Sequence, residues 1–147
     1  MADLNELDCK IHVEAPWTPE AIAGLLSRAL GGQVSVSPSA QVVLLPSAEI
    51  EIRENEDADS RRAADFPDGF LYFRYILEVY PVPTSSRQDR VSLAARVLEL
   101  CWSQGWPAVA ACDYESELPQ RGGYNNPAVP WLTQGAEAEE AIPKRPA

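Results

Sequence analysis

Three carboxylates in one short stretch, Asp113, Glu115 and Glu117, are the residues whose types and spacing best suit chemistry. They follow residues 108–112, a run of small apolar side chains that predicts a short strand. If this strand continued, alternate residues would share a face and the three carboxylates would lie together. Such a face could bind a divalent cation, act as general acid and base, or contact basic groups of a partner protein. The same stretch also suits a solvated loop.

The sequence contains few residues from which other kinds of catalytic or metal site could be built. The one histidine, His12, is expected on the exposed polar side of a strand, where it has no nucleophile beside it. Cys9 and His12 have the spacing of a zinc half-site, but a strand directs them to opposite faces and no second pair completes four ligands. Neither Gly31-Gly32 nor Gly122-Gly123 opens a helix, as a phosphate-binding loop requires. We therefore predict no catalytic residue, no metal site and no cofactor.

The three cysteines, Cys9, Cys101 and Cys112, lie in or beside apolar segments. An odd number of cysteines in such surroundings predicts reduced thiols that pack as small hydrophobic groups. A redox role would need a CxxC pair or a cluster that stabilises a thiolate, and the sequence shows neither.

The residues that follow the acidic stretch favour contact with a partner. Residues 118–127 and Trp131 supply Tyr, Trp, Asn and Gly, a mixture typical of binding loops. Tyr124 and Trp131 are equally consistent with packing of the C-terminal segment onto the sheet. The predicted partner-binding residues are a first patch of Asp113, Glu115, Glu117 and Tyr124, and a second patch of Glu54, Glu56, Asp57 and Asp59.

Hydrophobic periodicity and capping residues predict the elements that position these patches. Apolar alternation predicts strands at residues 9–14, 34–36, 50–52 and 70–80, and short apolar runs predict two more at residues 42–45 and 108–112. Thr18 and Pro19 begin a first helix that ends at Gly31, and Ser85 or Ser86 begins a second that runs to about Ser103. The polar residues between positions 54 and 68 predict a solvated loop.

The order β-α-β-β-β-α-β predicts an α+β fold, with a mixed or antiparallel sheet and two helices on one face. The strand at residues 70–80 is expected to pair with the final strand, joined to it by a right-handed crossover through the second helix. We predict a single domain over residues 1–134 and a disordered acidic, proline-containing tail over residues 135–147.

Composition narrows the class of partner. The chain has 147 residues, is 46% hydrophobic and carries 12 Lys plus Arg against 22 Asp plus Glu, a net charge of −10. This charge argues against nucleic acid and against anionic membranes as partners. The acidic N-terminus is unlike a signal peptide, and Arg74 and Glu78 interrupt the longest apolar stretch. We therefore expect a cytoplasmic protein.

In its size, its net charge, its lack of a catalytic constellation and the stretch from residues 111–115 to Gly123-Tyr124, the chain resembles the small acidic immunity proteins of bacterial polymorphic-toxin and contact-dependent systems. The resemblance implies a non-enzymatic cytosolic protein that binds a cognate toxin domain and blocks its active site or substrate entry. An acidic inhibitor would be steered toward a basic cleft. Two alternatives stay open: a small metal-dependent enzyme that uses the carboxylates of residues 113–117, and an accessory or chaperone protein for a secreted effector.

Overall fold

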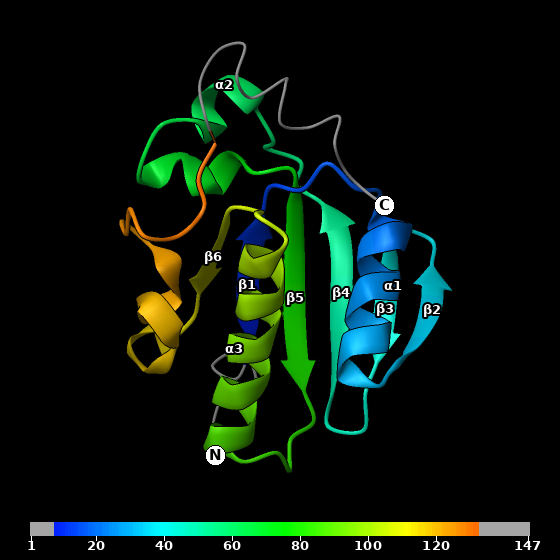
Figure 1. The fold of residues 1–147 in the computed structure, drawn as a ribbon. Coiled ribbons are helices and arrows are strands. Elements are labelled where there is room, and N and C mark those ends of the chain that lie inside the picture. The colour runs from blue at the N-terminus through cyan, green and yellow to red at the C-terminus, as the bar shows by residue number, and fades with distance from the viewer. Residues whose placement is uncertain (1–7, 133–147) are drawn as a thin grey trace.

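A computed structural model describes residues 8–132 and contains, within that range, a six-stranded antiparallel sheet with the long helices α1 and α3 on one face (Figure 1). The sheet order is β2-β3-β4-β5-β1-β6. The strands are β1 (Cys9–Val13), β2 (Gln33–Ser37), β3 (Ala40–Leu44), β4 (Ala48–Glu54), β5 (Tyr75–Pro81) and β6 (Ala108–Ala111). The helices are α1 (Pro19–Leu30), α2 (Ser60–Ala63) and α3 (Arg87–Ser103), with short 3-10 segments η2 (Asp68–Tyr72), η3 (Glu115–Glu117) and η4 (Pro119–Gly123). The predicted α+β class is confirmed.

Side-chain caps fix both long helices at the predicted residues. The Thr18 hydroxyl accepts a hydrogen bond from the Ala21 amide at 3.2 Å, and Gly31 ends α1 in the left-handed conformation. The Ser86 hydroxyl accepts from the Asp89 amide at 3.0 Å at the start of α3. These local interactions satisfy amides that have no partner within the helix, which is why the sequence reveals them.

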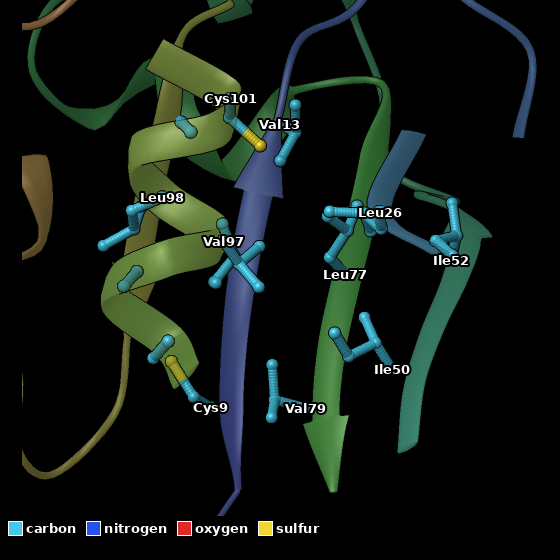
Figure 2. Close-up of a cluster of buried hydrophobic side chains, with 14 of the residues drawn as sticks. Cys9, Val13, Leu26, Ile50, Ile52, Leu77, Val79, Val97, Leu98 and Cys101 are labelled. Carbon is cyan, nitrogen blue, oxygen red and sulfur yellow. The ribbon is translucent and has the colours of Figure 1, made fainter. Parts of the chain in front are cut away.

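The hydrophobic core lies between the helices and one face of the sheet. Strand register places Ile11, Leu77 and Ile52 side by side on β1, β5 and β4, and all three are fully buried. Leu26 of α1 and Val97 of α3 pack over this row (Figure 2). The alternation read from the sequence therefore gives the helix-covered face correctly.

The strand predicted over residues 70–80 is wrong in its first part, because residues 68–72 form η2 and β5 begins at Tyr75. The buried side-chain amide of Asn55 donates hydrogen bonds to the carbonyls of Leu71 at 2.9 Å and Phe73 at 2.8 Å. These carbonyls are thus held by a side chain instead of a neighbouring strand. Apolar alternation alone cannot reveal this long-range interaction.

The expected pairing of the final strand with β5 is also wrong. β1 lies between β5 and β6, so that Ile11 faces Leu77 on one side and Ala110 on the other. Because β5 and β6 are both antiparallel to β1, α3 still connects two parallel strands, with β1 between them. A strand at the start of the chain completes the sheet, and sequence order gives no sign of it.

The segment over residues 54–68, predicted as a solvated loop, instead covers part of the sheet face opposite α1 and α3. We call this the helix-free face, because neither long helix lies on it. Asp59 caps α2, and Ala63 is fully buried with Phe73 and Val109 in a second, smaller cluster. Trp131 and Phe70 pack against this cluster.

No helix within the described residues is long and apolar enough to cross a membrane. The tail predicted for residues 135–147 lies outside the described residues.

Replacement of Leu77 by Ala tests the assignment of the core. We expect Leu77→Ala to lower the free energy of unfolding by about 2–5 kcal/mol, because it leaves a cavity under α1 and α3. Leu71→Ala, at a side chain that is 48% exposed, is the matched control and should cost less than about 1 kcal/mol. Urea denaturation measures both, and equal losses would contradict the assignment.

Candidate functional site

The three carboxylates of the acidic stretch do not share a face, because β6 ends at Ala111 and residues 115–117 form η3. The Glu115 carboxylate accepts a hydrogen bond from the Cys112 amide at 2.9 Å. The Glu117 carboxylate binds the Arg87 guanidinium, with Nε of Arg87 at 2.9 Å. Asp113 is exposed. The continued strand on which one acidic face depended is therefore absent at residues 112–117, and each carboxylate has different surroundings.

Of the three carboxylates, only that of Glu115 lines an open hollow of about 720 Å³, which lies beside η3 and η4. We call it the loop hollow. Two of the predicted partner-binding residues, Glu115 and Tyr124, line it. Among the others that line it are Leu118, Gln120, Arg121 and Asn126. Its walls therefore present a carboxylate, a guanidinium, amides and a phenol within one concave surface.

The backbone of the loop hollow is held in an unusual conformation. Gln120, Arg121 and Asn125 have φ values of 54°, 53° and 54°, in the left-handed region that L-residues other than glycine rarely adopt. The Asn126 side-chain amide donates to the Gln120 side-chain carbonyl at 2.8 Å, which ties the two ends of the loop together. Strain of this kind concentrates at functional sites, where surrounding contacts maintain it.

Gly123 allows the loop to lie directly against β6. A Cβ atom at this position would be 2.8 Å from the Ala108 carbonyl oxygen and 2.9 Å from the Trp102 ring, and its φ is 92°. The indole N–H of Trp102 donates to the same Ala108 oxygen at 3.0 Å. The loop therefore packs on the outer edge of β6, and α3 supports it from the side.

Tyr124 and Trp131 attach the C-terminal segment to the cover of the helix-free face. The Tyr124 hydroxyl donates to Asp68 at 2.6 Å, and its ring meets Phe70 edge-on at 5.7 Å between centroids. The Trp131 indole N–H donates to the Ala64 carbonyl at 3.1 Å. Trp131 is thus a packing residue. Tyr124 packs too, but it stays 43% exposed and lines the loop hollow.

The second acidic patch lies elsewhere, at the end of the sheet that carries α2 (Figure 1). Glu54 ends β4, and the Asp59 carboxylate caps α2 by accepting from the Arg61 amide at 3.0 Å. Glu56 and Asp57 are exposed in the turn between them. The structure therefore does not bring the two predicted patches together.

His12 is the residue whose surroundings sequence reasoning misjudged most. It was expected to be exposed, but it is only 8% exposed, and its ring meets that of Phe70 edge-on at 5.2 Å. Burial lowers the pKa of His12 to about 4, with smaller contributions from the positive charges of Lys10 and Arg53. The cover formed by η2 buries it. The large apolar side chains Phe70, Tyr72 and Ile76, which share one face of the strand predicted over residues 70–80, are the sequence signal that this face is partly covered.

Within residues 8–132, the carboxylates, cysteines and histidine do not converge on a metal site. Among the residues the structure describes, no group of three or more His, Cys, Asp and Glu side chains has an arrangement that could hold a metal ion. The polar groups of the loop hollow suit recognition by hydrogen bonds and charge.

Comparison with known proteins adds no family to this description: no protein-family model, curated protein or solved structure matches the chain.

The lowered pKa of His12 predicts a pH effect with a definite sign. Between pH 6.5, where a histidine ordinarily titrates, and about 4, the unfolded chain binds a proton that the folded chain does not. Acidification through this window should therefore remove up to about 3 kcal/mol of stability. Because the sequence has a single histidine, NMR titration of untagged protein should show its ring midpoint near 4. The urea-unfolded chain is the control, and a folded midpoint near 6.5 would contradict burial.

Alanine at Gly123 tests the docking of the loop on β6. We expect Gly123→Ala to lower the free energy of unfolding by about 2–4 kcal/mol, because the new methyl group adds steric overlap to an unfavourable φ. Gly105→Ala is the matched control, since Gly105 has a φ of 83° with no atom near its Cβ position. That control should cost about 1–2 kcal/mol. Urea denaturation distinguishes them, and equal losses would argue against close packing at Gly123.

Proposed function

We propose that the protein is a non-enzymatic bacterial binding protein that neutralises a cognate toxin domain by covering its active site or substrate entry. The observation that carries this proposal is the loop hollow, an open polar cavity built on a strained but well-anchored backbone beside exposed carboxylates. In this proposal the loop hollow receives a side chain that protrudes from the partner, and the protein acts in the cytoplasm.

Electrostatics favours a basic partner. The chain carries a net charge of −10, and Asp113, Glu117 and Asp68 are exposed near the loop hollow or its Tyr124 wall. Arg87 offsets part of this charge by pairing with Glu117. Complementary charge raises association rates and selects the orientation in which two surfaces meet. A basic cleft on a toxin domain is the kind of surface that this charge suits.

The conformation of the loop favours tight binding as well as fast association. Gln120 and Arg121 are already held in left-handed conformations, and η4 is anchored to β6 through Gly123. A loop that is ordered before binding loses less conformational entropy when a partner is bound. Tyr124 adds a rigid aromatic side chain whose hydroxyl is already oriented by its hydrogen bond to Asp68.

The test first identifies the partner protein and then measures whether this chain suppresses its toxicity. The tagged full chain is used to capture proteins from a lysate of its source organism at low and moderate salt, and each captured protein is identified by mass spectrometry. Each captured candidate is then expressed alone and together with this chain. The proposal requires a captured domain that stops growth by itself and is harmless in the presence of this protein. A captured protein with no toxic effect, or no specific capture at all, would overturn the proposal.

Charge reversal shows which of the two acidic patches contacts the partner. We expect the double variant Asp113→Lys/Glu117→Lys to slow association with the captured partner by about tenfold or more at low salt and to weaken its salt dependence. Glu115 is left in place because its carboxylate accepts from the Cys112 amide. The exposed Arg87 pair of Glu117 contributes little to stability.

The control for this experiment is Glu56→Lys/Asp57→Lys, which makes the same change in net charge on the second patch. Surface plasmon resonance measures both variants at several salt concentrations. Equal effects would show that only the overall charge matters, and a larger effect of the control would transfer the contact to the second patch.

A further inference from the structure

Cys9 and Cys112 face each other across two neighbouring strands. β1 and β6 are antiparallel, with Lys10 opposite Ala111 and Ile11 opposite Ala110. Continued by one residue past the end of β6, this register places Cys112 opposite Cys9. Cys9 lies in the core, Cys112 packs against the same cluster, and the two thiols are close enough for each to shift the pKa of the other. The fold therefore creates a pair of thiols from residues at opposite ends of the described chain.

This position matches the geometry of a disulfide. Directly opposed residues in an antiparallel ladder have Cα atoms about 4.5–5.5 Å apart. Disulfides usually join residues whose Cα atoms are about 4.4–6.8 Å apart. Both cysteines also pack on the core side of the sheet, toward α3, as a cross-strand disulfide requires.

The two thiols differ in exposure and in reactivity. Cys112 is half-buried and lines a surface cavity of about 280 Å³ together with Lys10 and Asp113, whereas Cys9 is fully buried. Interaction with the Cys9 thiol lowers the pKa of Cys112, and the backbone of Tyr114 adds to this effect. The pKa of Cys9 is raised, first by its interaction with Cys112 and then by burial. Cys112 is thus the accessible nucleophile, and Cys9 is the second thiol, which can react with Cys112 once Cys112 has been oxidised.

Charged and titratable groups around the pair act in both directions. Burial and the negative charges of Glu115 and Asp113 oppose the thiolate of Cys112. The buried Tyr114, whose pKa is raised chiefly by burial, lies against Cys9. The net result at Cys112 is a lowered pKa, whereas burial alone raises that of Cys101 to about 12. Cys101 therefore serves as an internal reference for an unreactive thiol.

We propose that Cys9 and Cys112 are a redox-active dithiol that a hydroperoxide converts to a cross-strand disulfide. The Cys112 thiolate attacks the terminal oxygen of the hydroperoxide, so that an S–O bond forms, the O–O bond breaks and an alcohol leaves after it takes up a proton. Cys9 sulfur then attacks the sulfenic acid sulfur of Cys112. An S–S bond forms, the S–O bond breaks, and the hydroxide leaves with the Cys9 proton as water.

Oxidation at this position acts next to the loop hollow. The Cys112 amide holds the Glu115 carboxylate, which lines the hollow, so the disulfide ties β1 to the start of the loop. The proposal of a redox-active dithiol is based on strand register and on the exposure of Cys112. It does not depend on the partner proposed above.

The test uses the untagged full chain and graded amounts of hydrogen peroxide. After each addition, free thiols are alkylated and peptides are mapped by mass spectrometry without reduction. We expect a Cys9–Cys112 disulfide that dithiothreitol reverses, formed at least about tenfold faster than any oxidation of Cys101. The oxidised protein should also melt at a higher temperature, because the crosslink restricts the unfolded chain. Cys112 oxidised to sulfinic acid while Cys9 stays alkylatable would overturn the proposal, as would equal oxidation of all three cysteines.

Two variants examine the order of the steps. Cys101→Ser should form the disulfide as fast as the unmodified chain. Cys9→Ala should instead accumulate a sulfenic acid on Cys112 that dimedone traps, because the thiol that follows it is missing. If Cys9→Ala does not fold, peptide mapping of the unmodified chain still decides the outcome.

Discussion

Antiparallel pairing of β1 with β5 on one side and with β6 on the other joins the first described strand of the chain to the last. Ile11 lies at the centre of this arrangement, between Leu77 and Ala110, and contributes to the core under both long helices. Without β1, α3 would connect two strands that do not touch. The edge of β6 that supports the loop hollow, the register of the two thiols and the burial of His12 are all consequences of this one insertion.

The two faces of the sheet are stabilised in different ways. Hydrophobic burial against α1 and α3 stabilises one face. On the other, η2 and the C-terminal segment cover one part, held by the side-chain hydrogen bonds of Asn55 and Trp131. Elsewhere on this face Arg53 lies between Glu51 and Glu78, at 2.9 and 2.8 Å. Glu78 is nearly buried there, and the guanidinium supplies the opposite charge that a buried carboxylate requires.

The loop hollow and the thiol pair are neighbours for one physical reason, the early end of β6. Because the strand stops at Ala111, the chain turns at Cys112, and Glu115 returns to accept from its amide. The segment that follows then packs on the edge of β6, where Gly122 and Gly123 permit close contact. An edge strand with free backbone groups invites aggregation, and this loop covers it. The same cover carries the surface that we propose as the binding site.

The sequence by itself determined the elements whose signals are local. The caps at Thr18 and Ser86, the alternation of β1 and β4 and the end of α1 at Gly31 depend on residues a few positions apart. It also placed Glu115 and Tyr124 in one candidate patch, and both line the loop hollow. Only the tertiary structure decided the position of β1 in the sheet, the η2 turn held by Asn55, the burial of His12 and the meeting of Cys9 with Cys112. Each of these depends on contacts between residues far apart in the chain, which periodicity and spacing do not encode.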